Sequence, residues 1–141
     1  MTFFRPTEVM TEHAQANIVL FYSKLESFRT AEKYTDVTIQ CDDKYFKCHR
    51  LTLATASDVF DNMFDSKKCK EQSVLIREFT AETLSEVLQF IYTGDVSVTS
   101  ANVCDLFKAS RFFYLTGIAE LCLKFVKQNK MTVNTTLKIA C

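Results

Sequence analysis

Glycine, proline and tryptophan are scarce in this 141-residue chain. It contains two glycines, one proline and no tryptophan, but thirteen phenylalanines. A loop that cradles phosphate groups needs several glycines so that the backbone can approach the ligand closely, and such a nucleotide-binding loop is therefore not expected. Because glycine and proline are the main residues of sharp turns, their scarcity predicts a helix-rich chain.

The chain also lacks an excess of either charge. Lys and Arg together number 17, as do Asp and Glu, and this balance gives no general attraction to nucleic acids or to acidic lipids. No apolar run reaches the 18 residues of a membrane span, and residues 1–6 do not have the pattern of a secretory signal. We therefore expect no nucleic-acid or membrane partner, and a cytoplasmic or nuclear location.

Enzyme motifs are absent as well. The sequence has no G-x-S-x-G and no H-E-x-x-H, and its only histidines are His13 and His49. Cys48 precedes His49, but neighbouring residues on a strand point to opposite faces, so this pair is poorly placed for nucleophilic catalysis. We expect no catalytic activity and no cofactor.

The six cysteines, at positions 41, 48, 69, 104, 122 and 141, include no C-x-x-C pair. Most occupy apolar positions, which indicates buried free thiols in a reducing compartment. Disulfides remain an alternative, as does a metal site formed by Cys41, Cys48 and His49, although that site lacks a second spaced pair of ligands. Cys69 is flanked by two lysines that would lower its pKa, so it is the expected exposed thiol.

Residues 13–31 predict a helix with an unusually wide apolar stripe. Thr11 is suited to cap its start, and residues 18–22 are all apolar. A helix that is apolar around most of its circumference must be covered on more than one side. In so small a domain, the stripe belongs either to the core alone or in part to a contact with another chain. The residues of the stripe are Ala14, Ile18, Phe21, Leu25 and Phe28.

The remaining pattern mixes strands and helices without the regular alternation of a doubly wound sheet. Alternating apolar residues predict a hairpin, a third strand and a brief fourth strand, at 36–41, 45–48, 74–76 and 96–98. Helical periodicity predicts helices at 49–56, 57–65, from Thr80 to the residue before Gly94, 101–113 and 117–129. The expected fold class is α+β, with helices dominant.

Several spaced motifs resemble the BTB/POZ family. Tyr34–Ile39 and Phe46–Ala54 are similar to its D-V-x-φ and F-x-x-H-K/R-x-x-L-A patterns, where φ is apolar. Ser57–Phe64 is similar to its S-x-x-F-x-x-M-F, and residues 92–94 match its Y-T-G. The resemblance implies a helical cluster capped by a small three-stranded sheet over residues 13–130, preceded by an extension at 1–12.

The kelch-like branch of the family is the most similar. His13-Ala14 before the first helix resembles the opening of that branch. Residues 131–141 resemble the start of the three-box and BACK helical region that follows the domain there, so we expect the chain to be part of a longer protein.

The resemblance implies that the chain forms a homodimer, chiefly through the first helix. A two-fold interface is self-complementary, so the apolar stripe would meet its own copy. Asp36 and Arg50 match a charged pair near the floor of the family's interface, although they could also be ordinary surface charges. The expected interface residues are Ile18, Phe21, Tyr22, Leu25, Phe28, Asp36, Arg50, Leu53 and Ala56.

For many kelch-like members the resemblance implies binding to cullin-3 as the substrate adaptor of a ubiquitin ligase, with the substrate held by domains outside this chain. The family's apolar-x-Glu motif is matched by Cys69-Lys70-Glu71. Cys69 replaces a larger Met or Leu and so buries less area; a merely solvated loop is the alternative. Supporting contacts are expected from Phe60, Asp61, Phe64, Tyr114 and Leu115.

Two other functions fit the same resemblance. One is a BTB dimerisation domain of a transcriptional regulator that recruits a corepressor, and the other is a cytoskeletal BTB-kelch scaffold. The sequence that follows residue 141 would separate the regulator from the other two, since zinc fingers favour the regulator and kelch repeats favour an adaptor or a scaffold.

Overall fold

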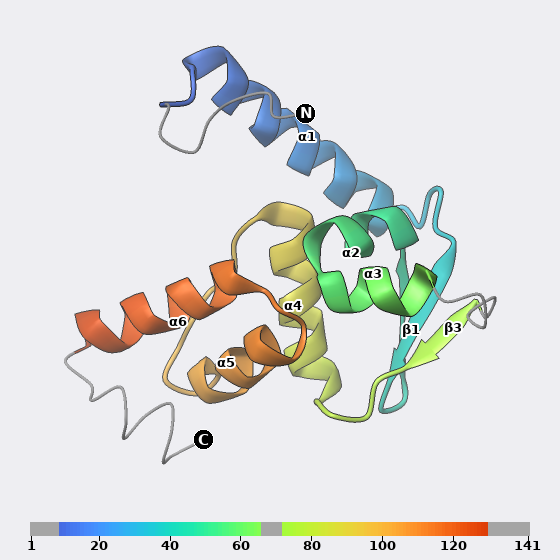
Figure 1. Cartoon of the computed structure of the whole chain (residues 1–141). Helices are drawn as coiled ribbons and strands as arrows, with labels where there is room; N and C mark the ends of the chain where they lie inside the picture. Colours follow the sequence, from blue (N-terminus) through green and yellow to red (C-terminus); the bar gives the residue numbers. More distant parts are fainter. Residues whose placement is uncertain (1–8, 66–71, 130–141) are drawn as a thin grey trace.

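The computed structural model describes residues 9–65 and 72–129. This part of the chain forms an α+β fold of helices and one small sheet (Figure 1), which confirms the predicted fold class. The elements in chain order are α1 (Glu12–Thr30), β1 (Val37–Cys41), β2 (Lys44–Cys48), α2 (Arg50–Ala56), α3 (Asp58–Asp65), β3 (Ser73–Leu75), α4 (Ala81–Thr93), α5 (Val103–Phe112) and α6 (Thr116–Gln128).

The sheet has the strand order β2-β1-β3, with β1 in the centre. β1 and β2 form the predicted antiparallel hairpin, in which Val37 lies opposite Cys48 and Cys41 opposite Lys44. β3 pairs with β1 in parallel, so that Ile39 lies opposite Val74. The alternate residues of β1 are buried, as the period of two in the sequence predicted.

The predicted fourth strand at 96–98 is wrong, because residues 95–99 have no strand structure. Their amides bond to nearby side chains instead: the Val96 N–H donates to Asp95 Oδ1 at 2.8 Å, and the Thr99 N–H donates to Asn102 Oδ1 at 2.7 Å. Such local bonds compete with sheet pairing. Val96 is nevertheless buried, so its apolar character indicated burial in the core rather than a strand.

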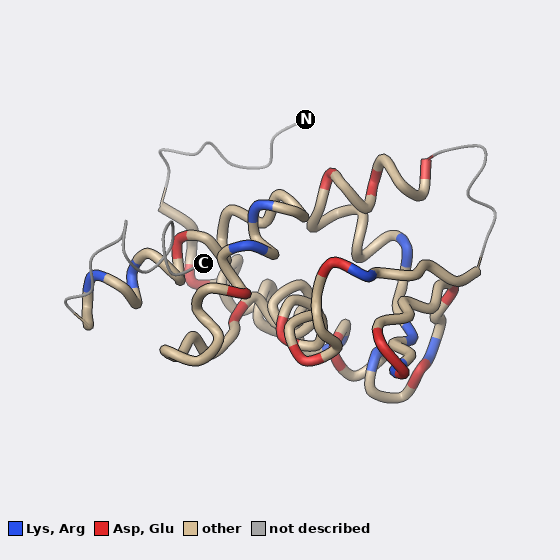
Figure 2. Tube along the Cα trace, turned by 90° about the horizontal axis from the view of Figure 1, so that it is seen from below, with Lys and Arg blue, Asp and Glu red and all other residues tan. Residues whose placement is uncertain are grey.

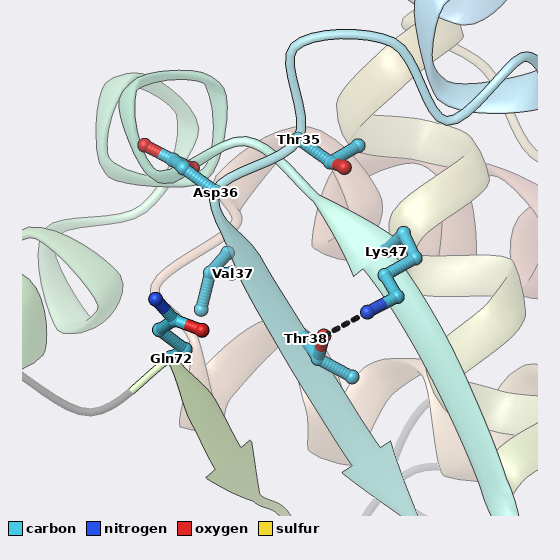
Figure 3. Close-up of a pocket in the computed structure, with 6 residues that line it drawn as sticks. All are labelled: Thr35, Asp36, Val37, Thr38, Lys47 and Gln72. Atoms are coloured by element: carbon cyan, nitrogen blue, oxygen red, sulfur yellow. Dashed lines mark hydrogen bonds between the residues drawn. The ribbon is translucent and has the colours of Figure 1, made fainter.

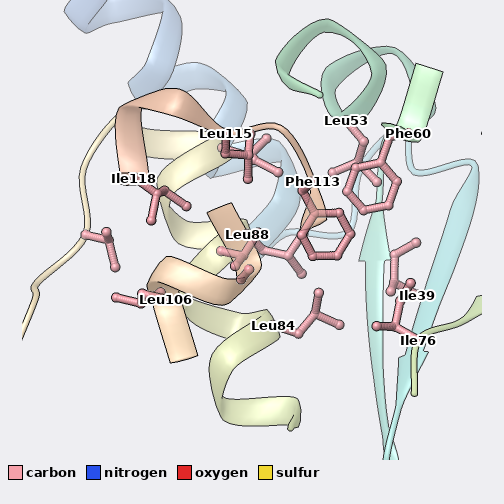
Figure 4. Close-up of a cluster of buried hydrophobic side chains, with 14 of the residues drawn as sticks. Ile39, Leu53, Phe60, Ile76, Leu84, Leu88, Leu106, Phe113, Leu115 and Ile118 are labelled. Atoms are coloured by element: carbon pink, nitrogen blue, oxygen red, sulfur yellow. The ribbon is translucent and has the colours of Figure 1, made fainter. Parts of the chain in front are cut away.

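Helix α4 lies at the centre of the molecule, between the sheet with α2 and α3 on one side and α5 with α6 on the other (Figure 1). Thr80 caps its start by accepting a hydrogen bond from the Thr83 N–H at 3.2 Å, as predicted. Gly94 ends it with φ 81°, a left-handed conformation that glycine adopts without steric cost. Figure 4 shows Leu84 and Leu88 of α4 between the sheet and the last two helices.

Helix α1 is attached differently from the other helices, because none of its residues is buried. Thr11 caps it by accepting a hydrogen bond from the Ala14 N–H at 3.1 Å, as predicted. In Figure 1 only its C-terminal part lies against the rest of the chain, and the preceding turns extend away from the core. The N-terminal part of the wide apolar stripe is therefore not covered by the core of its own chain, whereas Leu25 packs against that core.

Candidate interaction surfaces

Large apolar side chains are exposed along the middle of α1. The exposed fraction is 64% for Val19, 67% for Leu20 and 65% for Phe21, and Ile18 is 40% exposed. Tyr22, Leu25 and Phe28, nearer the C-terminal end, are half-buried. Four consecutive apolar residues that face water on a helix represent apolar area that association could remove.

A largely apolar groove of about 680 Å³ runs between α1 and α2. It brings together five residues predicted for a dimer interface, namely Ile18, Phe21, Tyr22, Leu25 and Ala56. The other residues that line it are Asn17, Leu51, Thr52, Thr55 and Ile91.

Leu53 does not face this groove, which corrects its predicted place in the interface. Its side chain is fully buried in the core of the chain, so it has no surface left for a partner. Leu51 lines the groove instead and is 80% exposed. Residues two apart on a helix point about 200° apart, and the sequence of a seven-residue helix did not show which of the two leucines faces outward.

Asp36 and Arg50 lie in direct contact through hydrogen bonds that each involve a backbone group. The Arg50 N–H donates to Asp36 Oδ1 at 2.7 Å, and Arg50 Nε donates to the Asp36 carbonyl at 3.3 Å. Asp36 is exposed rather than partly buried, and its carboxylate binds the first backbone N–H of α2. His49, the residue before α2, makes no side-chain cap, so Asp36 performs that role from a distant position.

A small polar pocket of about 300 Å³ lies at the start of β1, with Asp36 among its lining residues (Figure 3). Within it, Lys47 Nζ donates to Thr38 Oγ1 at 3.0 Å. The Asp36 carboxylate points away from Lys47 and toward α2 (Figure 3). Lys47 and Asp36 thus line the same pocket, but the Asp36 carboxylate turns away from it to accept the Arg50 N–H.

The adjacent Cys48 and His49 do not form a nucleophile and base. Burial raises the pKa of the Cys48 thiol to about 12, so the thiolate required for attack is scarce at neutral pH. Both ring nitrogens of His49 are bonded elsewhere, to Tyr92 and to the carbonyl of Lys33. The side chains of this pair contribute to packing and hydrogen bonding.

Three of the cysteines, Cys41, Cys48 and Cys122, are buried free thiols as predicted. Cys104 is half-buried on α5. Cys69, the predicted exposed thiol, lies outside the described residues. Within the described parts, no group of three or more His, Cys, Asp or Glu side chains could hold a metal ion.

The residues predicted for cullin contact separate into surface and core. Asp61 is exposed, Tyr114 is 71% exposed and Phe64 is half-buried. Phe60 and Leu115 are buried, and the Phe60 ring stacks on Phe113 with centroids 5.0 Å apart. Phe60 and Leu115 therefore support the surface from inside and do not offer side chains to a partner.

The motif Cys69-Lys70-Glu71, on which the cullin prediction mainly depended, lies outside the described residues. Before the motif, α3 ends at Asp65. After it, Gln72 immediately precedes β3. The match of this motif to the family pattern thus remains a sequence-based prediction.

Charges of both signs are mixed over the described parts of the chain. Figure 2 shows Lys and Arg beside Asp and Glu around the sheet, whereas α3 and α4 carry only acidic charged residues. The longest helix, α1, is not apolar enough to cross a membrane, and neither is any other helix among residues 9–65 and 72–129.

Comparison with known proteins identifies the class to which this arrangement belongs. The family model of the BTB/POZ domain matches residues 25–130. The BTB domain of zebrafish PATZ1 superposes with a TM-score of 0.74 over 85% of this chain and 99% of that one, at 20% identity. The chain belongs to the BTB/POZ family.

Its similar curated relatives are kelch-like proteins. Kelch-like protein 24 of Homo sapiens is 35% identical over 84% of this chain, and Kelch-like protein 40a of Danio rerio is 30% identical over 92%. The chain spans only 19% and 21% of these two proteins, about a fifth of each. The predicted resemblance to kelch-like BTB domains is confirmed.

Proposed function

We propose that this chain is the homodimerising BTB domain of a kelch-like adaptor that joins cullin-3 to substrates for ubiquitination, in the cytoplasm or nucleus. The chain itself supplies no bond-making step in this role. It holds two copies together and presents a surface to the ligase, which raises the local concentration of substrates bound elsewhere in the protein.

One observation carries the dimer: a row of large apolar side chains on α1 faces water beside a groove of similar character. Fully burying a Leu, Ile or Phe side chain contributes roughly 1.5–3 kcal/mol before the costs of association. Phe21 of α1 and Leu51 of α2 lie on the two sides of this groove. In a two-fold pair each copy would offer the same helix and the same groove, so each interface residue would be buried once in each of the two copies.

Sedimentation velocity over a range of concentrations tests the dimer. We expect the wild type to sediment as a dimer at micromolar concentration. The double variant Phe21→Ser with Leu51→Ser is expected to sediment as a folded monomer, because both side chains are exposed in the single chain and their loss leaves the core intact.

Tyr45→Ser is the matched control, because Tyr45 on β2 is 64% exposed, almost the same as Phe21 at 65%. It removes a large exposed side chain from the sheet and should leave the dimer unchanged. A wild-type chain that stays monomeric at high concentration, or a double variant that still dimerises, would contradict the proposal.

The α3 helix together with the turn between α5 and α6 forms the proposed cullin surface. Asp61 and Tyr114 are its exposed members, and aromatic residues that are exposed within a packed surface are frequent binding hot spots. Phe64 adds a half-buried ring that stacks on buried Phe60 at 5.7 Å between centroids. A rigid aromatic base of this kind reduces the entropy lost on binding.

Calorimetric titration with the N-terminal region of cullin-3 tests this surface. We expect Asp61→Ala with Tyr114→Ala to weaken binding at least ten-fold, whereas Tyr45→Ala leaves it unchanged. A dimeric wild-type chain that gives no heat of binding would contradict the adaptor role and favour a cytoskeletal scaffold or a transcriptional regulator.

A further inference from the structure

Helix α1 contacts the core only through its C-terminal half, where Leu25 packs against it and Arg29 lies over Tyr92, so its orientation depends on these contacts and on the linker that follows it. At 1.5 Å per residue its 19 residues span roughly 28 Å. A rotation of about 10° at the C-terminal end would therefore move the other end by roughly 5 Å. An interface built from side chains of both α1 and α2 cannot tolerate a displacement of that size.

The linker between α1 and β1 is bent into an unfavourable backbone conformation. Glu32 has φ 52° and Tyr34 has φ 64°, left-handed values that cost about 1 kcal/mol or more for residues other than glycine. The Glu32 N–H donates to the Arg29 carbonyl at 3.0 Å, and the Lys33 N–H donates to the Phe28 carbonyl at 2.8 Å. This is the pattern of a Schellman motif with Glu in the place that glycine usually occupies.

A strained linker keeps one conformation only when surrounding contacts hold it, and His49 supplies such a contact. Its Nε2 lies 2.7 Å from the Lys33 carbonyl oxygen. A carbonyl oxygen can only accept, so Nε2 carries the hydrogen and donates it. Lys33 lies between the two left-handed residues, and His49 therefore binds the linker at its most bent point.

Tyr92 of α4 in turn fixes the His49 ring. The Tyr92 hydroxyl accepts a hydrogen bond from the His49 backbone N–H at 3.0 Å and, 2.7 Å from Nδ1, donates its own hydrogen to that nitrogen. Tyr92 is fully buried, and the Arg29 guanidinium of α1 lies over its ring, 5.1 Å from the centroid. The central helix thus contacts both the clamp residue and the end of α1.

We propose that His49, held by Tyr92, is the positioning residue of the dimerisation helix. By bonding the Lys33 carbonyl it fixes the linker and so sets the angle at which α1 leaves the core. This inference rests on the proposed dimer, in which that angle determines whether the groove of one copy fits the other.

The variant His49→Ala tests the clamp, with residual dipolar couplings of backbone N–H groups as the readout. These couplings report the orientation of α1 relative to α4–α6 in either a monomer or a dimer. We expect smaller, averaged couplings in α1 and unchanged ones in α4–α6. His49→Gln should largely restore the wild-type couplings, because its side-chain amide can still donate to the carbonyl.

Tyr92→Phe is a second variant, which removes only the hydroxyl that holds His49. It should reduce the α1 couplings in the same way as His49→Ala, but to a smaller extent. Ser57→Ala is the matched control. Its buried hydroxyl also donates to a distant carbonyl, that of Phe113, at 2.6 Å, but this bond does not involve the linker. It should lower the melting temperature without changing the α1 couplings.

The dimer dissociation constant gives an independent measure. If His49→Ala leaves only about a third of the chains with α1 in the binding pose, the constant rises roughly ten-fold, because both copies must be competent. Unchanged α1 couplings in His49→Ala would overturn the clamp even if the wild type dimerises. A monomeric wild type would instead contradict the proposed function, while the couplings would still decide the clamp.

Discussion

At the scale of single residues, Gly117 shows how closely α6 approaches α4. A Cβ atom added at Gly117 would lie 2.5 Å from Cζ of Phe90, closer than two carbon atoms can pack. Phe90 is half-buried, so its ring cannot swing freely into solvent. The missing side chain is thus required for packing between these two helices.

We expect Gly117→Ala to lower the free energy of unfolding by about 1–2 kcal/mol. Overpacking costs roughly 1–3 kcal/mol, and the higher helix propensity of alanine returns up to about 1 kcal/mol of this. Urea unfolding of the wild type and the variant measures the difference. In a Phe90→Leu background the same change should cost less, whereas an equal cost in both backgrounds would show that the Phe90 contact is not the cause.

Also at the residue scale, the sequence could identify apolar residues but not always the direction in which each points. The alternation in β1 and the stripe of α4 each span enough residues to fix one buried face, and both predictions were confirmed. Leu51 and Leu53 lie on a helix of seven residues, and Phe60 and Phe64 on one of eight. In such short helices the buried face is set by neighbours distant in sequence, such as Phe113, which no local pattern shows.

At the scale of elements, helix α2 depends on a cap from another part of the chain. Asp36 precedes β1, yet its carboxylate accepts the Arg50 N–H at 2.7 Å at the start of α2. A side-chain acceptor at a helix N-terminus contributes about 0.5–2 kcal/mol. The hairpin between the two residues brings them together, so the cap couples formation of the sheet to formation of α2.

We therefore expect Asp36→Ala to lower the free energy of unfolding by about 1 kcal/mol, within the usual range for a lost cap. Asp36→Asn should cost less, since its side-chain oxygen can still accept the Arg50 N–H. Chemical unfolding of the two variants beside the wild type provides the measurement. Equal losses would indicate that the charge of Asp36, and not its acceptor oxygen, stabilises the start of α2.

The elements most accurately predicted were those whose signals are local. Thr11, Thr80 and Gly94 mark helix ends by bonds or conformations within their own turn, and the hairpin follows from a polar turn between alternating residues. The parallel pairing of β3 with β1 and the irregular segment around Val96 depend on contacts between distant parts of the chain. The apolar character of Val96 predicts its burial. Whether the segment around it forms a strand or a loop depends on whether another strand lies beside that segment.

At the scale of the whole molecule, the described part of the chain consists of a well-packed core and one helix, α1, whose N-terminal half the core does not cover. The core includes buried residues from every helix except α1. The N-terminal half of α1 therefore adds little to the folding of a single chain, and its apolar side chains can contribute only when another surface meets them. The proposed dimer thus links stability to assembly.

That linkage predicts a melting temperature that depends on protein concentration. A folded dimer that unfolds to two separate chains gains about 1.4 kcal/mol of stability for each ten-fold rise in concentration. For two chains of 141 residues, an unfolding entropy of about 2 cal/mol/K per residue converts this gain to roughly 2 °C. Scanning calorimetry over a hundred-fold range of concentration should therefore show a rise of roughly 4 °C in the melting temperature of the wild type.

The Phe21→Ser, Leu51→Ser variant should melt at a temperature independent of concentration, because its folded state no longer includes a second copy. A constant melting temperature for the wild type over that range would mean that α1 stays uncovered in solution.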